Sequence, residues 1–205
     1  MEAHWKELLA ILNYQDGESI LDVGGAMDPV PIADQVIDIM NLNKNKKAYT
    51  LLDLCCDEFP FDDKSFDICI CSQTLEDLAS PRLALREMAR VCKRGIIEVP
   101  HRGPESIKNT YSLHGKKPDW AMDETWCFGT EHHKWLIEVI DNKLIFTVKN
   151  YLHLMYNPIP QWKGPGGIRF VWYDTIPHNV MYDIHPESMF ANYQDFRERS
   201  RCYWE

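Results

Sequence analysis

Five short apolar runs alternate with turns and crossovers between residues 19 and 100, and this alternation restricts the fold more than any other feature of the sequence. Each run is shorter than a typical helix, and several are apolar at consecutive positions, which is typical of strands buried on both faces. Strands of this kind, separated by crossovers, predict an α/β fold with an open, mostly parallel sheet. The predicted strands are residues 19–23, 35–39, 49–54, 65–71 and 95–100.

Two segments of the first half have the apolar spacing of a helix. The first, from Trp5 to Leu12, follows an acidic start and lacks a basic region, so we expect an amphipathic helix and not a signal peptide. The second follows Ser80 and Pro81, which suit the N-cap and the first position of a helix. These helices would flank the predicted sheet.

The second half of the chain has a different pattern. Residues 101–130 are polar and loop-like, whereas residues 132–150 hold two strand-like runs around Asp141 and Asn142, which is a hairpin signal. Residues 151–205 are rich in aromatic side chains, so we expect a C-terminal β-hairpin and an aromatic cap on the sheet. The pattern also predicts a strand over residues 168–176 and a last helix from Pro186 through Arg199.

The charge of the chain restricts its partners. The 205 residues carry a net charge of −9, with 31 acidic against 22 basic side chains. Nucleic-acid binding needs clustered Lys and Arg, and the short basic runs at 44–47 and 115–117 fall in predicted loops, so a nucleic-acid partner is disfavoured. No run approaches the ~18 apolar residues of a membrane helix, so we expect no membrane partner.

The cysteines indicate a compartment. There are seven, an odd number, and no C-x-x-C pair occurs. Cys55, Cys56, Cys69 and Cys71 lie in or beside apolar runs, which predicts buried, reduced thiols. Reduced thiols are typical of cytosolic proteins, so we expect a cytoplasmic location.

The turn after the first predicted strand has the composition of a nucleotide site. Gly24 and Gly25 would let a ligand approach the backbone, and Asp38 closes the second strand, where an acid can bind ribose hydroxyls. A simple turn between strands explains two glycines equally well. The crossover is short, with Asp28 and Pro29 placed to begin about one helical turn, and the third glycine of a dinucleotide fingerprint is missing.

Three further motifs carry a resemblance to a known family. The chain reads PFDDKSFD at 60–67, CSQTLEDL at 71–78 and RGIIEVP at 94–100. Together they resemble the class I S-adenosylmethionine-dependent methyltransferases over residues 18–100, and the later HHKW with its hairpin is similar to one subgroup of that family. The resemblance implies a Rossmann-like fold, S-adenosylmethionine as cofactor and a methyltransferase activity. It also implies one domain, residues 1–205, with a cofactor-binding half (1–100) and a substrate-side insertion and cap (101–205).

The resemblance implies roles for residues of the first two strands. Asp22, Gly24 and Gly25 would line the methionine and ribose parts of the cofactor, and Asp38 would hold the ribose.

The resemblance implies roles after the third and fourth strands as well. The family has an acid after strand three that contacts the adenine amino group; the motif spacing leads to Cys55, so Asp53, with a lengthened loop, is the expected contact. Ser72 and Gln73 would lie beneath the sulfonium.

A proton must leave the acceptor if the acceptor is a hydroxyl or an ammonium, which requires a base near the methyl group. Four side chains that follow predicted strand ends or open the hairpin are candidates: Glu76, His101, His132 and His133. Glu76 could equally be an acid that favours a helix N-terminus, and His101 a solvated loop histidine.

Two further side chains are candidates for contacts with the acceptor. Arg102 can bind an anionic group of the acceptor, and Trp135 is either an acceptor contact or a core residue. Adjacent strand residues point to opposite faces, so we expect no metal site at His132 and His133.

Three functions are compatible with these patterns. The first is S-adenosylmethionine-dependent methyl transfer to an oxygen or nitrogen atom of a small or medium polar acceptor, such as a sugar, a nucleotide-linked compound or another metabolite. The second is a non-catalytic or metal-binding module on the same fold. The third, a nicotinamide-dependent oxidoreductase, is disfavoured by the short crossover and the missing glycine motif. The expected partner is a small-molecule or glycan-type substrate, and the oligomeric state stays open.

Overall fold

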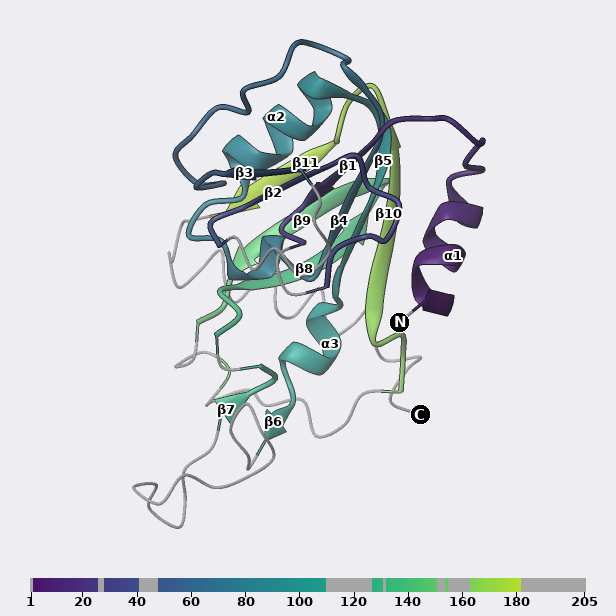
Figure 1. Ribbon diagram of the computed structural model, residues 1–205. Helices are drawn as coiled ribbons and strands as arrows, with labels where there is room; N and C mark the ends of the chain where they lie inside the picture. Colours follow the sequence, from purple (N-terminus) through teal and green to yellow (C-terminus); the bar gives the residue numbers. More distant parts are fainter. Residues whose placement is uncertain are drawn as a thin grey trace.

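A six-stranded sheet forms the centre of the protein (Figure 1). The strands run in the order β10-β5-β4-β1-β2-β3, and all neighbours are parallel except β10, which is antiparallel to β5. The predicted α/β fold with a mostly parallel sheet is therefore confirmed. The computed structural model describes residues 2–25, 28–40, 48–109, 127–130, 132–150, 154 and 163–181. The strands of the sheet are β1 (Ile20–Val23), β2 (Gln35–Asp38), β3 (Ala48–Leu51), β4 (Phe66–Ser72), β5 (Cys92–Pro100) and β10 (Gly167–Tyr173).

Different helices cover the two faces of this sheet, because side chains alternate between faces along each strand. Helix α1 (Glu2–Ile11) packs on one face, where its apolar side chains share a buried cluster with Ile20. Helix α2 (Arg82–Val91) packs on the opposite face, in a cluster that contains Leu21 (Figure 1). Both predicted helices are present, although α2 begins one residue later than expected, with Pro81 as its cap.

A second, three-stranded sheet packs on the α2 side. It has the order β11-β9-β8 and contains the predicted hairpin, β8 (Trp135–Ile140) and β9 (Lys143–Val148), together with β11 (His178–Met181). Asp141 and Asn142 have φ values of 47° and 57°, as a tight hairpin turn of the mirror-image type requires. The remaining elements are η1 (Leu75–Asp77), α3 (Arg102–Glu105), β6 (Lys108–Asn109) and β7 (Cys127–Phe128).

The crossover between β1 and β2 contains no helix over its described residues 28–34, so the expected helical turn is wrong. Val30 lies between two prolines, and a residue before proline is pushed away from the α region. Its N–H donates instead to Oδ2 of Asp22, at 2.7 Å. The crossover is therefore an irregular loop held by the side chain of β1.

Three further expectations concern the strand over residues 168–176, the burial of the cysteines, and the C-terminal helix and cap. The strand predicted over 168–176 exists as β10, but it is the edge strand of the central sheet and not part of a cap. Cys69 and Cys71 are buried as predicted, whereas Cys56 is exposed. The helix predicted from Pro186 and most of the aromatic cap lie outside the described residues.

Among the described helices, none has the length and apolar character needed to cross a bilayer.

Candidate functional site

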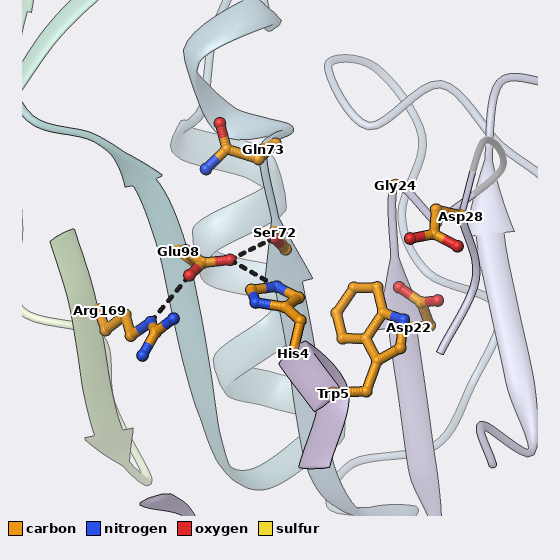
Figure 2. A pocket seen from close by; sticks show the side chains of 10 residues that line it. His4, Trp5, Asp22, Gly24, Asp28, Ser72, Gln73, Glu98 and Arg169 are labelled. Atoms are coloured by element: carbon orange, nitrogen blue, oxygen red, sulfur yellow. Dashed lines mark hydrogen bonds and ion pairs between the residues drawn. The ribbon is translucent and has the colours of Figure 1, made fainter. Parts of the chain in front are cut away.

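A cavity of about 550 Å³ lies at the carboxyl ends of β1 and β4, under helix α1 (Figure 2). The strand order reverses between β1 and β4, and open α/β sheets bind ligands at such a switch point. The volume falls in the range of pockets that hold a cofactor-sized molecule. The cavity is lined by His4, Trp5, Asp22, Gly24, Gly25, Asp28, Ser72, Gln73, Glu98 and Arg169.

The turn after β1 leaves no room for side chains. Gly24 has a φ of +82°, and a Cβ there would lie 2.2 Å from Oγ1 of Thr74. A Cβ on Gly25 would lie 2.1 Å from Oδ2 of Asp22, because that carboxylate folds back over the turn to accept the N–H of Val30. Both glycines are therefore required by the local packing, and the backbone of the turn is open to a ligand on the cavity side.

A network of polar side chains forms one wall of the cavity, and we call it the Glu98 network. Ser72 and Arg169 are the lateral neighbours of Glu98 in β4 and β10, so the three side chains share one face of the sheet. Ser72 Oγ donates to Glu98 Oε2 at 2.7 Å, and Arg169 Nε donates to Oε1 at 2.8 Å. His4 Nε2 lies 3.0 Å from Oε2 (Figure 2). Arg169 also pairs with Glu7, at 2.6 Å. The network thus anchors α1 over the cavity.

Trp5 and Gln73 complete the cavity from opposite sides. Figure 2 shows the indole of Trp5 between His4 and Asp22. Trp5 is buried, and its indole N–H has no hydrogen-bond acceptor among the described residues. Gln73 directly follows β4 and has a φ of 52°, a left-handed conformation that costs about 1–2 kcal/mol in a residue with a side chain. Strain of this kind is typical of functional sites.

Five of the predicted cofactor residues line the cavity and three do not. Asp22, Gly24, Gly25, Ser72 and Gln73 are together at its edge.

The other three predicted cofactor residues are not among the lining residues. Asp38 is buried at the end of β2, where its Oδ1 accepts the N–H of Met40 at 2.9 Å. Asp53 accepts the N–H of Cys55 at 2.9 Å. Cofactor contacts by Asp38, Asp53 and Cys55 stay predictions.

A second polar region lies where η1 meets the segment before β8, and it contains three of the predicted bases, Glu76, His132 and His133. Lys134 N–H donates to the Glu76 carbonyl at 2.7 Å and joins the two segments. Both carboxylate oxygens of Glu76 are buried without a hydrogen-bond partner in the described structure, and burial raises the pKa of Glu76 to about 7. His133 Nδ1 lies 3.2 Å from Glu105 Oε1, and Lys149 Nζ lies 2.8 Å from Oε2.

The two adjacent histidines are not in a strand. They precede β8, which begins at Trp135, and the N–H of His133 donates to the Thr130 carbonyl in a turn. The rings of His132 and His133 are in edge-to-face contact, with centroids 4.7 Å apart. The premise that the two side chains must point to opposite faces is therefore wrong.

The remaining predicted site residues have structural partners. Arg102 is buried and pairs with Glu138 of β8 at 2.5 Å. Trp135 is buried in the core, and its indole N–H donates to the Leu78 carbonyl at 2.7 Å. His101 caps α3, since its Nδ1 accepts the N–H of Gly103 at 3.0 Å.

The neutral state of His101 predicts a dependence of stability on pH. Burial lowers the pKa of His101 from 6.5 to about 4, although Glu138 acts against this shift. Between pH 6.5 and pH 4, His101 is protonated in the unfolded chain but neutral in the folded chain. The contribution of His101 to the free energy of unfolding is therefore complete above pH 6.5 and decreases as the pH falls toward 4. We expect a loss of roughly 2–3 kcal/mol in the free energy of unfolding between pH 7 and pH 4.5.

His101→Asn is the matched variant, because its side-chain oxygen can still cap α3 but does not titrate. Urea denaturation of both proteins at several pH values isolates the effect of His101, since all other titrating groups are shared. The difference between the two proteins should shrink or reverse as the pH falls. A constant difference between pH 7 and pH 4.5 would contradict the neutral, buried histidine.

Five lining residues are outside the set that sequence reasoning assigned to the site: His4, Trp5, Asp28, Glu98 and Arg169. One signal was available, because Glu98 is the single acid in the apolar run GIIEVP. A lone charge in a buried strand needs a partner or a ligand. His4, Trp5 and Arg169 come from the two ends of the described chain, and no sequence pattern connects them.

The parallel order β3-β2-β1-β4-β5, the glycine turn after β1 and the cavity at the switch point define a Rossmann-like α/β fold with a candidate ligand site. Residues 19–97 match the family model described as "Methyltransferase domain". The match covers less than half of the chain, and it supports the resemblance to class I methyltransferases that the motifs at 60–67 and 71–78 carry.

The solved structures that match part of the chain include two bacterial proteins. The YcgJ protein from Bacillus subtilis has 19% sequence identity and a TM-score of 0.42, with 49% of this chain and 52% of that chain covered. An S-adenosylmethionine-dependent methyltransferase from Mesorhizobium loti has 17% identity and a TM-score of 0.42, with 62% and 63% covered. The chain thus spans between half and two thirds of the length of these proteins. No curated protein is significantly similar to the sequence.

Proposed function

We propose that the cavity binds S-adenosylmethionine and that the protein transfers its methyl group to an oxygen or nitrogen atom of a small or medium polar acceptor. The observation that carries this proposal is the position of the cavity. It lies at the switch point of a methyltransferase-type sheet, between the glycine turn after β1 and the strained Gln73 after β4.

The residues around the cavity fit this cofactor. Gly24 and Gly25 line the cavity, so a ligand can reach their backbone, and a side chain at either position would displace Thr74 or Asp22. The unsatisfied indole N–H of Trp5 offers a donor, and three carboxylates offer acceptors and negative charge for a cationic ligand. Those carboxylates are Asp22, Asp28 and Glu98.

When bound, the cofactor supplies a methyl group on a positively charged sulfur, which is already activated for displacement. The protein's own task is to position the acceptor and to exclude water. His4 and Trp5 of α1 line the cavity and would contribute to both (Figure 2). His4 is the best-placed base at the cavity, because its Nε2 contacts Glu98. A neutral imidazole there can take the acceptor proton, and the adjacent carboxylate would stabilise the resulting cation.

The acceptor class follows from size and charge. The cavity has a volume of about 550 Å³, and its lining combines three carboxylates with one arginine. The net charge of −9 disfavours a polyanionic nucleic acid. We therefore propose a sugar, a nucleotide-linked compound or another small metabolite as the methyl acceptor.

Calorimetric titration of the full chain with S-adenosylmethionine and S-adenosylhomocysteine tests the proposal without knowledge of the acceptor. We expect one binding site per chain and a rise in melting temperature with these ligands but not with NAD. Asp22→Ala should weaken binding on the order of 100-fold, because the turn after β1 loses the carboxylate that shapes it.

Asp34→Ala is the control. Asp34 also accepts a backbone N–H, from Ile20 at 2.7 Å, but it is exposed and does not line the cavity. It should keep the affinity of the unchanged protein. Absence of binding to both cofactor forms, or protection by NAD alone, would refute the proposed function.

A further inference from the structure

A three-residue cluster near the start of the hairpin has the composition of a metal site. Asp77 ends η1, and His132 and His133 come from the turn before β8. Each residue offers one ligand atom, and the three atoms lie within 4.8 Å of one another. We infer that Asp77, His132 and His133 bind a divalent transition metal ion of the Zn²⁺ type.

The burial of individual atoms supports a ligand at this place. Oδ1 of Asp77 is buried without a hydrogen-bond partner among the described residues, and Nε2 of His132 lies 3.6 Å from it. A buried carboxylate oxygen without a hydrogen bond costs free energy. A bound cation removes this cost directly.

The surroundings of His133 have the arrangement that metal-bound histidines require. A ligating histidine normally directs its other ring nitrogen toward a carboxylate, which fixes the ring orientation. Nδ1 of His133 lies 3.2 Å from Oε1 of Glu105, so Nε2 is the nitrogen left for the metal. Glu105 is itself held by the buried Lys149, at 2.8 Å. The partner carboxylate is therefore fixed in place before the metal binds.

The donor set selects the class of metal. Two imidazoles and one carboxylate suit Zn²⁺ or Fe²⁺ better than Mg²⁺ or Ca²⁺, which prefer oxygen ligands alone. Bonds of about 2.0–2.2 Å in a tetrahedral site place ligand atoms roughly 3.3 Å apart, so the widest pair must close by about 1.5 Å. His132 can make this movement, because 43% of its side chain is exposed.

The three ligands found among the described residues leave at least one coordination position of the metal to water or another ligand. Metal sites of this kind are typical of catalysis and ligand positioning, whereas purely structural zinc sites use four protein ligands. The site uses none of the residues that line the cofactor cavity. Metal binding can therefore be tested independently of methyl transfer.

The test uses the full chain without an affinity tag, stripped with a chelator and then titrated with Zn²⁺ by calorimetry. We expect one ion per chain, and affinity losses of at least ~100-fold in His132→Ala and in Asp77→Ala. His178→Ala is the control, since His178 lies in β11 outside the cluster and should leave the affinity unchanged. Circular dichroism and melting curves check that each variant is folded. We expect His132→Ala to fold, because the His132 side chain is exposed.

Cobalt substitution separates this site from binding by thiols such as the exposed Cys56. A nitrogen and oxygen donor set gives weak visible bands without a thiolate-to-metal charge-transfer band. That spectrum, lost in His132→Ala and kept in His178→Ala, supports the site. A thiolate band, no bound ion, or equal affinity in all variants would overturn it.

Discussion

Gly24→Ala should abolish measurable S-adenosylmethionine binding and lower the free energy of unfolding by about 2–5 kcal/mol. The left-handed backbone of Gly24, with a φ of +82°, accounts for about 1–2 kcal/mol of this loss. The new methyl group would also lie 2.2 Å from Thr74, a buried β-branched side chain whose hydroxyl donates to the Ser72 carbonyl at 3.0 Å. Overpacking of this kind costs a further 1–3 kcal/mol, roughly, and displaces the turn that faces the cavity.

Gly17→Ala separates the two contributions. Gly17 has nearly the same φ, +88°, but no atom lies within 4 Å of a Cβ built on it. It should therefore lose only about 1–2 kcal/mol and keep full cofactor affinity. Urea denaturation and calorimetric titration of both variants measure the two effects. If both variants lose the same stability and both still bind the cofactor, the tight turn after β1 is not part of the site.

Glu138→Ala should lower the free energy of unfolding by about 3–5 kcal/mol, because it leaves the guanidinium of Arg102 buried without its carboxylate. Both side chains are nearly inaccessible, and their charged atoms are 2.5 Å apart. Sequence reasoning assigned Arg102 to the acceptor. The ion pair gives this arginine a structural role, and cofactor affinity should survive in the fraction of Glu138→Ala that stays folded.

Glu58→Ala is the matched control for the ion pair. Glu58 also pairs with an arginine, Arg86, at 3.1 Å, but both side chains are more than half exposed. Solvent screens such pairs, so the loss should be at most ~1 kcal/mol. Urea denaturation measures the free energy of unfolding of both variants. If Glu138→Ala and Glu58→Ala lose similar amounts, the buried Arg102–Glu138 pair is no more important for stability than an exposed pair.

The central sheet could be predicted from the sequence because its strands are marked by local composition. Each parallel strand is a short apolar run, and the hairpin turn at Asp141 and Asn142 is marked by residues that tolerate positive φ. The first crossover was mispredicted because Val30 between two prolines cannot continue a helix that Asp28 would begin. Local sequence signals therefore predict strands and turns well. They do not predict that the N–H of Val30 donates to the side chain of Asp22.

The cofactor side of the site was predicted in part for the same reason. Gly24, Gly25 and Ser72 directly follow or end predicted strands, so their place at the sheet edge follows from topology. Glu98 and Arg169 meet across an antiparallel pair whose partner strand comes almost at the end of the described chain. Such pairing depends on register over long sequence distances, which single residues do not encode. His132 and His133 were misjudged because their segment is a turn and not a strand.

The Arg169–Glu7 contact joins residues separated by 162 positions, so the cavity depends on both ends of the described chain at once. During synthesis the N-terminal helix leaves the ribosome long before β10 exists, and N-terminal segments otherwise fold early. Glu7 therefore gains Arg169 as a partner only after β10 has emerged and joined the sheet, whereas the contact of His4 with Glu98 uses a strand that is made earlier. The Arg169–Glu7 contact is consequently among the last contacts of the described residues to form during synthesis.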